Sequence, residues 1–374
     1  MRTKKLISII LIASMLLAGC RAKAEQGSAG TKDTEETTTM TSEATVTPTN
    51  TPTPSPSPTP TVKIENMSNN DEGHYSFQPH VFSKSYLAEF GEEKRDCFFA
   101  YCDALCKGEE TFDCPDEEFY YWCFGALSNF FFPFSMEYAS PYSQDKRPSW
   151  KDGKGYIYYT VSKEEYLEKE KAFEKEIEDI LNDCLSDDYT DLEKTLALYE
   201  YMTMNYEYDM DMYDNLSDRS DELSPYRCLK EKRGICCEIA GLYSYLLLQA
   251  GVDSDEIGGD GEFNGQIEGH SWVYVTLDGQ PYHIDPTWGV DNYRPPLCYY
   301  LMTDELRMDR DGFRKGTFSL GVSDEAAREA FEFQAADDRY STLWSGFYMG
   351  MDRENKYIYY EDESGQQQKF SYAA

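Results

Sequence analysis

The sequence predicts an α+β fold in which a helix bearing a cysteine packs on an antiparallel sheet bearing a histidine and an aspartate. A glycine turn leads into Cys236, and the apolar run that follows ends at Gly251, as helices commonly do. Alternating β-branched and aromatic residues form two strand patterns, at 269–275 and 282–285, which carry His270 and Asp285. These segments predict a core at residues 187–310, preceded by a mainly helical lobe at 73–186. Within the lobe the stretch 155–161 predicts one strand, and Thr190 with Glu193 predicts a capping box that opens a helix of the core.

The turn between the two strands fixes which residues share a face. Asp278 and Gly279 are a strong signal for a two-residue type I′ hairpin. Counting outward from that turn pairs position 277 with 280 and position 272 with 285. Because paired residues share a face and side chains alternate, His270 and Asp285 are expected as diagonal neighbours, roughly 7–8 Å apart at the backbone. A carboxylate so placed can orient an imidazole toward a thiol.

The thiol has its own local support. Cys236 is predicted in the first turn of its helix, where unpaired N–H groups and the positive helix end favour a thiolate. Cys237 is rotated from it by about 100° and is expected to face elsewhere. Glu238 is rotated by about 200° and is expected to face solvent, since an inward carboxylate would oppose ionisation of the thiol.

The stretches 234–240, 269–273 and 285–288 together resemble the core of the transglutaminase-like superfamily, whose bacterial members share a papain-like thiol fold. The resemblance implies that Cys236 is the nucleophile, His270 the base and Asp285 the orienting acid. It also implies action on amide or peptide bonds, with a peptidase or amidase favoured over a cross-linking transglutaminase. Residues expected to support the site, as an oxyanion donor or in contact with the triad, are Tyr226, His283 and Trp288.

Each motif also has a purely structural interpretation. A single buried cysteine is usually a small core residue, His283 competes with His270, and Asp285 before a proline could only begin a turn. Their order and the hairpin register together favour the triad. A non-catalytic cell-surface module that binds wall peptide or glycan is the alternative function. A structural lipoprotein of the envelope is a weaker third possibility.

The N-terminus has the pattern of an export signal. Basic residues precede a short apolar run that ends in Leu-Ala-Gly-Cys20, which resembles a bacterial lipobox. Residues 1–20 are therefore expected to be a lipoprotein signal, with lipidation of Cys20 anchoring the protein to the outer face of the bacterial cell membrane. Residues 21–72 are rich in Thr, Ser and Pro and predict a disordered tether.

Composition limits the partners. A net charge of −34 and a pI near 4.4 argue against nucleic acid, so we expect a protein or peptide substrate such as wall peptide. The eleven cysteines allow buried thiols or one or two disulfides, and neither a metal site nor a cofactor is predicted. The aromatic clusters 119–122 and 130–134 are expected in the core rather than lining a groove. Residues 311–374 predict a C-terminal extension with a β-hairpin.

Overall fold

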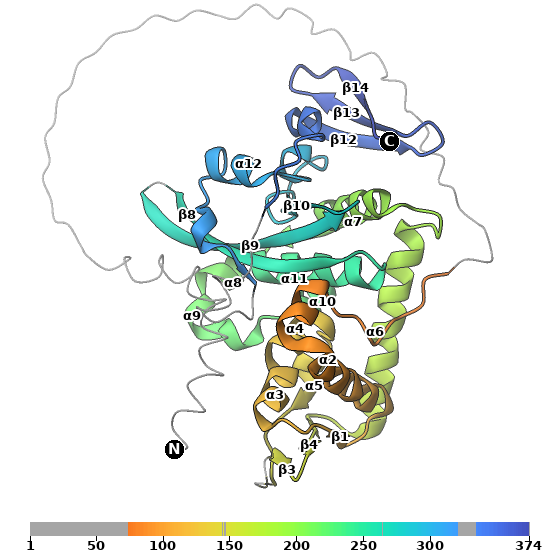
Figure 1. Cartoon of the computed structure of the whole chain (residues 1–374), viewed down its shortest axis with the longest axis vertical. Coiled ribbons are helices and arrows are strands. Elements are labelled where there is room, and N and C mark those ends of the chain that lie inside the picture. The colour runs from red at the N-terminus through yellow and green to blue at the C-terminus, as the bar shows by residue number, and fades with distance from the viewer. Residues whose placement is uncertain (1–73, 144, 146, 264, 321–333, 374) are drawn as a thin grey trace, which may run out of the picture.

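The computed structural model describes residues 74–143, 145, 147–263, 265–320 and 334–373 (Figure 1). The expected signal segment at 1–20 with Cys20, and the tether at 21–72, lie outside the described residues. The described chain is a mixed helix and sheet structure with antiparallel sheets, so the expected α+β class is confirmed.

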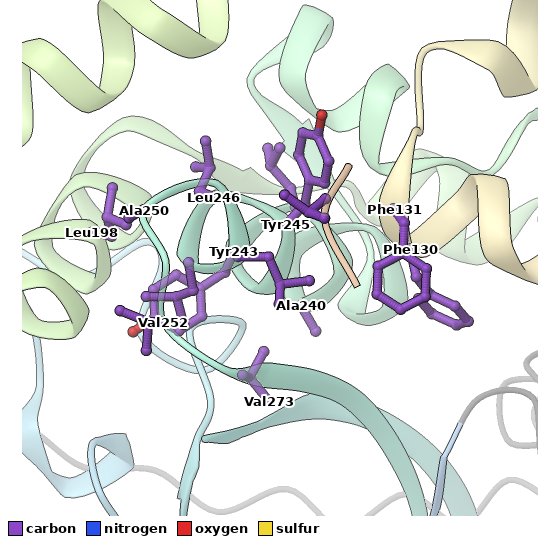
Figure 2. Close-up of a cluster of buried hydrophobic side chains, with 14 of the residues drawn as sticks. Phe130, Phe131, Leu198, Ala240, Tyr243, Tyr245, Leu246, Ala250, Val252 and Val273 are labelled. Carbon is purple, nitrogen blue, oxygen red and sulfur yellow. The ribbon is translucent and has the colours of Figure 1, made fainter. Parts of the chain in front are cut away.

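Helix α11 (Cys236–Gln249) lies between the N-terminal lobe and the main sheet (Figure 1). Its side chains are almost all buried, which explains why the sequence shows a nearly continuous apolar run instead of an amphipathic stripe. Figure 2 shows Val273 of the sheet on one side of this helix, and Phe130 and Phe131 of the lobe on another. The helix ends as predicted, with Gly251 at φ 81° and its N–H donated to Leu248 O.

The main sheet contains the predicted hairpin in the predicted register. Its strand order is β10-β9-β8-β11, all antiparallel, with β8 (Ser254–Phe263), β9 (Gln266–Leu277), β10 (Gln280–Ile284) and β11 (Ser319–Leu320). Asp278 and Gly279 both have positive φ, 51° and 76°, as a type I′ turn requires. Gln280 pairs with Leu277, and the ladder continues outward as counted from the turn.

The N-terminal lobe is mainly helical. Its helices are α2 (Lys84–Lys107), α3 (Glu117–Trp122), α4 (Ser128–Phe131), α5 (Ser135–Tyr138) and α6 (Lys163–Cys184). Short strands accompany them: β1 (Thr111–Asp113), β2 (Ala139–Ser140), β3 (Trp150–Lys151), β4 (Lys154–Tyr156) and β5 (Tyr158–Tyr159). The sequence pattern predicted one strand at 155–161, which is wrong, because β4 and β5 belong to different small sheets. The two part at Ile157, which is buried and donates its N–H to Glu110 O.

The aromatic clusters of the lobe form its core, as expected. Phe119, Tyr120 and the phenylalanines at 130–132 and 134 are all buried. Their rings contact one another and rings from α2 and α6, mostly edge to face or tilted. These clusters therefore pack the lobe and do not line an exposed groove.

The segment that joins the lobe to α11 consists of short elements. They are α7 (Asp191–Asn205), β6 (Glu207–Tyr208), α8 (Met210–Asp214), α9 (Leu216–Arg219), α10 (Pro225–Glu231) and β7 (Arg233–Gly234). The predicted capping box opens α7, with Thr190 and Glu193 bonded reciprocally. The parallel pairing of β6 with β7 brings the chain to the glycine turn immediately before Cys236.

After β10 the chain forms α12 (Asp304–Asp309) and a three-stranded meander of β12 (Gly346–Asp352), β13 (Tyr357–Asp362) and β14 (Gln367–Ser371). The expected C-terminal hairpin is β13–β14, and β12 adds a third strand. Within the part of the chain that the structure describes, none of the helices has the length and apolar character needed to cross a membrane.

Candidate active site

His270 and Asp285 meet at the end of the main sheet. The imidazole Nε2 lies 2.8 Å from Asp285 Oδ2, and both side chains are shielded, the imidazole 10% exposed and the carboxylate fully buried. Asp285 follows β10 directly, and its backbone N–H is donated to Tyr299 O. Because Nε2 is held by the carboxylate, Nδ1 is the ring nitrogen available to a thiol.

Cys236 provides that thiol. It is the first residue of α11 and is 4% exposed. Its side chain interacts with His270 by hydrogen bonding and by charge. The structure therefore brings together the three residues that the sequence nominated, and the thiol lies at a helix N-terminus, where a negative charge is favoured.

The electrostatics of the site favour a charged imidazole. Burial lowers the pKa of His270, but the Asp285 carboxylate and the Cys236 side chain outweigh it and raise that pKa to about 9. Burial likewise opposes ionisation of Asp285, yet His270 and Arg307 hold the pKa of this carboxyl below its usual range. Near neutral pH the arrangement is thus a carboxylate beside an imidazolium, which in turn stabilises a thiolate.

Arg307 is a functional residue that sequence analysis missed. Its fully buried guanidinium donates to Asp285 Oδ2 at 3.0 Å and to Asp311 Oδ2 at 2.8 Å. It also lies over the rings of Trp272, Trp288 and Phe313, at 4.3–5.0 Å from their centroids. Arg310 lies in the same segment, and the sequence pattern does not distinguish the two arginines. The contact of Arg307 with Asp285 is therefore evident only from the fold.

Aromatic rings hold the imidazole in place. Trp288 stacks on His270 with ring centroids 5.1 Å apart, and its backbone N–H points to Asp285 Oδ1 at 3.4 Å. Trp272 stacks on the imidazole less closely, at 6.1 Å. Trp288 thus contacts His270 through its ring and Asp285 through its backbone. Contact with the triad was one of the two roles expected of this residue.

His283 is linked to the site through Trp272. Trp272 Nε1 donates to His283 Nδ1 at 2.9 Å, and His283 Nε2 lies 2.8 Å from Asp304 Oδ1. Since Nδ1 accepts, Nε2 carries the proton and donates it to the carboxylate. His283 is fully buried; it holds Trp272 in place and is not arranged to activate the thiol.

The expectation that Glu238 faces solvent is wrong. Its carboxylate is buried, accepts from Arg227 Nε at 2.8 Å, and also pairs with Arg227 Nη2. It accepts from the backbone N–H of Ile235 at 3.1 Å, so it caps the helix that begins at Cys236. Rotation relative to Cys236 does not decide the exposure of Glu238, because α10 covers the opposite side of α11. Arg227 offsets the charge that would otherwise oppose the thiolate.

Two further groups lie near the thiol. Cys237 packs against the separate cluster of Met212, Leu216 and Ile235, and the adjacent Cys236, followed by burial, raises the pKa of its thiol well above the usual range. Glu256 of β8 is completely buried, and burial together with the charge of Cys236 raises its pKa well above the usual range. Ser271 lies close to Glu256, but neither carboxyl oxygen makes a hydrogen bond of normal geometry. Burial therefore favours the protonated form of Glu256 beneath the first turns of α11.

Tyr226 does not fit the expected role of oxyanion donor. Its ring packs in the lobe against Phe134, Tyr138 and Phe173, with centroids 5.3–6.0 Å away. The expectation rested on position in the sequence alone. In the structure Tyr226 joins the lobe to α10.

A thiol at a helix N-terminus that faces a histidine and an aspartate from an antiparallel sheet defines the Cys-His-Asp class of thiol site. Residues 178–286, which include all three side chains, match the model of the transglutaminase-like superfamily. The chain therefore contains a transglutaminase-like core, and the resemblance inferred from its motifs is confirmed.

Curated relatives are similar to part of the chain. Kyphoscoliosis peptidase of Homo sapiens is 27% identical, and that of Mus musculus 26% identical, over 122 residues. The match covers 30% of this chain but spans only 18% of the length of those relatives.

Two solved structures are also similar. A candidate cysteine protease from Cytophaga hutchinsonii is 16% identical with a TM-score of 0.24, covering 36% of this chain and 38% of its own. A candidate protease from Parabacteroides distasonis is 14% identical with a TM-score of 0.23, covering 40% and 35% respectively.

Proposed function

We propose that this protein is a thiol enzyme that acts on amide or peptide bonds. The observation that carries the proposal is the buried His270–Asp285 pair in contact with a thiol at the start of a helix. In the proposed reaction the Cys236 thiolate attacks the carbonyl carbon, and the imidazolium of His270 gives its proton to the leaving amine. Asp285 keeps the ring oriented throughout.

The developing oxyanion needs donors near the thiol. The backbone N–H of Cys236 lies in the first turn of α11, where N–H groups have no carbonyl partner within the helix. Water resolves the acyl-enzyme in a hydrolase, whereas an amine resolves it in a cross-linking enzyme. We favour hydrolysis, so peptidase or amidase activity is the first to assay.

The test of this function is the selective chemistry of Cys236. The chain is treated with iodoacetamide over a range of pH, and the labelled cysteines are located by mass spectrometry. In parallel, the wild type, Cys236→Ala and Cys298→Ala are incubated with a mixture of peptides. We expect rapid labelling at Cys236 and cleavage or deamidation that Cys236→Ala abolishes. Cys298→Ala serves as the control because this half-buried thiol lies outside the triad.

Two outcomes would end the enzyme proposal. One is undiminished turnover by Cys236→Ala, and the other is labelling spread evenly over the cysteines with no turnover of any peptide. The second outcome, combined with peptide or glycan binding that persists in Cys236→Ala, would support a non-catalytic surface module.

We also propose that the enzyme is tethered to the outer face of the membrane by lipid on Cys20. The motif before Cys20 and the polar segment after it support this location. Metabolic labelling with a fatty acid should mark the wild-type chain and not Cys20→Ser. An unlabelled wild-type chain would contradict the anchor without affecting the proposed chemistry.

A further inference from the structure

A cluster of three metal-binding groups lies in the lobe, outside the thiol site. Cys106 is in the last turn of α2, while Glu170 and Glu174 are one turn apart on α6. One donor atom from each side chain lies within 4.8 Å of the other two. The cluster therefore joins α2 and α6, and the sequence pattern of neither helix predicts this contact.

Burial and the neighbouring carboxyl of Glu174 make a charged Glu170 unfavourable and raise its pKa to about 8. Glu170 is 1% exposed, and its Oε1 has no hydrogen-bond partner. Carboxylates at positions i and i+4 of a helix repel each other when both are charged. Among the described residues, neither glutamate forms an ion pair with a lysine or arginine. A buried carboxyl oxygen without a donor usually indicates a missing partner.

A second unpartnered polar atom lies on the same side of α6. Tyr166 precedes Glu170 by one helical turn, is fully buried, and its hydroxyl also has no hydrogen-bond partner. A water bound to a metal ion at Glu170 could accept from such a hydroxyl. Glu170 Oε1 and the Tyr166 hydroxyl are thus two buried polar atoms without a hydrogen bond, and a hydrated cation would supply partners for both.

We propose that Cys106, Glu170 and Glu174 bind one Zn²⁺ ion, with water in the fourth position. A thiolate ligand selects zinc over calcium or magnesium, and three protein ligands are enough for a tetrahedral site completed by water. Bond lengths of about 2.3 Å to sulfur and 2.0–2.2 Å to oxygen place tetrahedral donors about 3.4–3.6 Å apart. The observed spread of up to 4.8 Å then closes by about one ångström, which side-chain rotation can supply.

The ion would hold the end of α2 against α6. Both helices pack on the aromatic core of the lobe, and this core in turn supports α11. Zinc at this position would therefore have a structural role within the lobe.

The experiment uses the full-length chain carrying Cys236→Ser, so that the reactive thiol cannot bind the metal. Zn²⁺ is added, excess is removed by gel filtration, and the metal retained per chain is measured. Alkylation of Cys106 is followed by mass spectrometry with and without Zn²⁺. The variants Cys106→Ser and Glu170→Gln are compared with the controls Cys184→Ser and Glu168→Gln, which change a half-buried thiol and an exposed carboxylate of α6.

We expect about one Zn²⁺ per chain, protection of Cys106 from alkylation, and a higher melting temperature with the metal. Cys106→Ser and Glu170→Gln should weaken binding by more than roughly tenfold, since even loss of an outer partner of a ligand costs 10–100-fold. The controls should retain the metal. No retained Zn²⁺, or equal retention by all four variants, would overturn the proposal and leave Glu170 as a buried acid that keeps its proton.

Discussion

Replacing Asp285 by asparagine is the most direct test of the electrostatics of the site. The substitution keeps the shape of the side chain, but it removes the charge that faces His270 and replaces one of the two accepting oxygens by an NH2 donor. The rise of the imidazole pKa from 6.5 to about 9, at about 1.4 kcal/mol per pKa unit, corresponds to about 3 kcal/mol in favour of the charged ring. Since burial still acts in the variant, the pKa of His270 should fall to about 6.5 or lower.

This change alters reactivity at pH 7.5. A ring with a pKa of about 9 is almost fully protonated there, whereas one with a pKa near 6.5 is protonated in roughly one molecule in ten. The thiolate–imidazolium pair should become roughly tenfold less populated, and alkylation of Cys236 should slow by a similar factor. Side-chain NMR can follow the ring directly, because the chain has only four histidines.

Stability provides a second measurement of the same effect. The raised pKa of His270 contributes stability that is fully present below pH 6.5 and is lost as pH rises through about 9. The difference in unfolding free energy between wild type and Asp285→Asn should therefore shrink by about 2–3 kcal/mol between pH 6 and pH 9.5. Asp309→Asn, which removes an exposed carboxylate of α12, is the control and should show no such trend. A variant whose His270 still titrates near 9, or a stability gap independent of pH, would refute the reasoning.

Two other predictions concern the supports of the site. Arg307→Met should destabilise the protein by about 3 kcal/mol in urea unfolding, because it removes the guanidinium from two buried carboxylates and leaves them with His270 and Arg310 as cationic partners. The control Arg314→Met, whose side chain is 49% exposed, should cost less than about 1 kcal/mol, and an equal cost for both would contradict the role of Arg307. Gly259→Ala should cost about 1–3 kcal/mol, since its new Cβ would lie 2.6 Å from the Trp272 ring beside the imidazole. The adjacent Gly258→Ala meets nothing closer than 3.6 Å, so similar melting temperatures for the two alanine variants would show that this packing is unimportant.

The sequence by itself determined the parts of the site that depend on local geometry. An Asp-Gly turn fixes a register, and alternation then places His270 and Asp285 on one face. The capping box at Thr190 and the glycine that ends α11 are likewise local features. These are interactions between residues close in the chain, or paired through one turn, so sequence spacing was enough to predict them.

The tertiary structure decided which groups surround the triad. Arg307 donates to Asp285, which lies 22 positions away in the sequence. Glu238 faces the interior because its carboxylate pairs with Arg227 of α10. The same holds for Tyr226, which packs into the lobe, and for Cys106, which meets two glutamates of a helix some 64 positions away. Side-chain burial and ion pairing between distant segments depend on how helices pack on the sheet, and the periodicity of one segment carries no information about its partner.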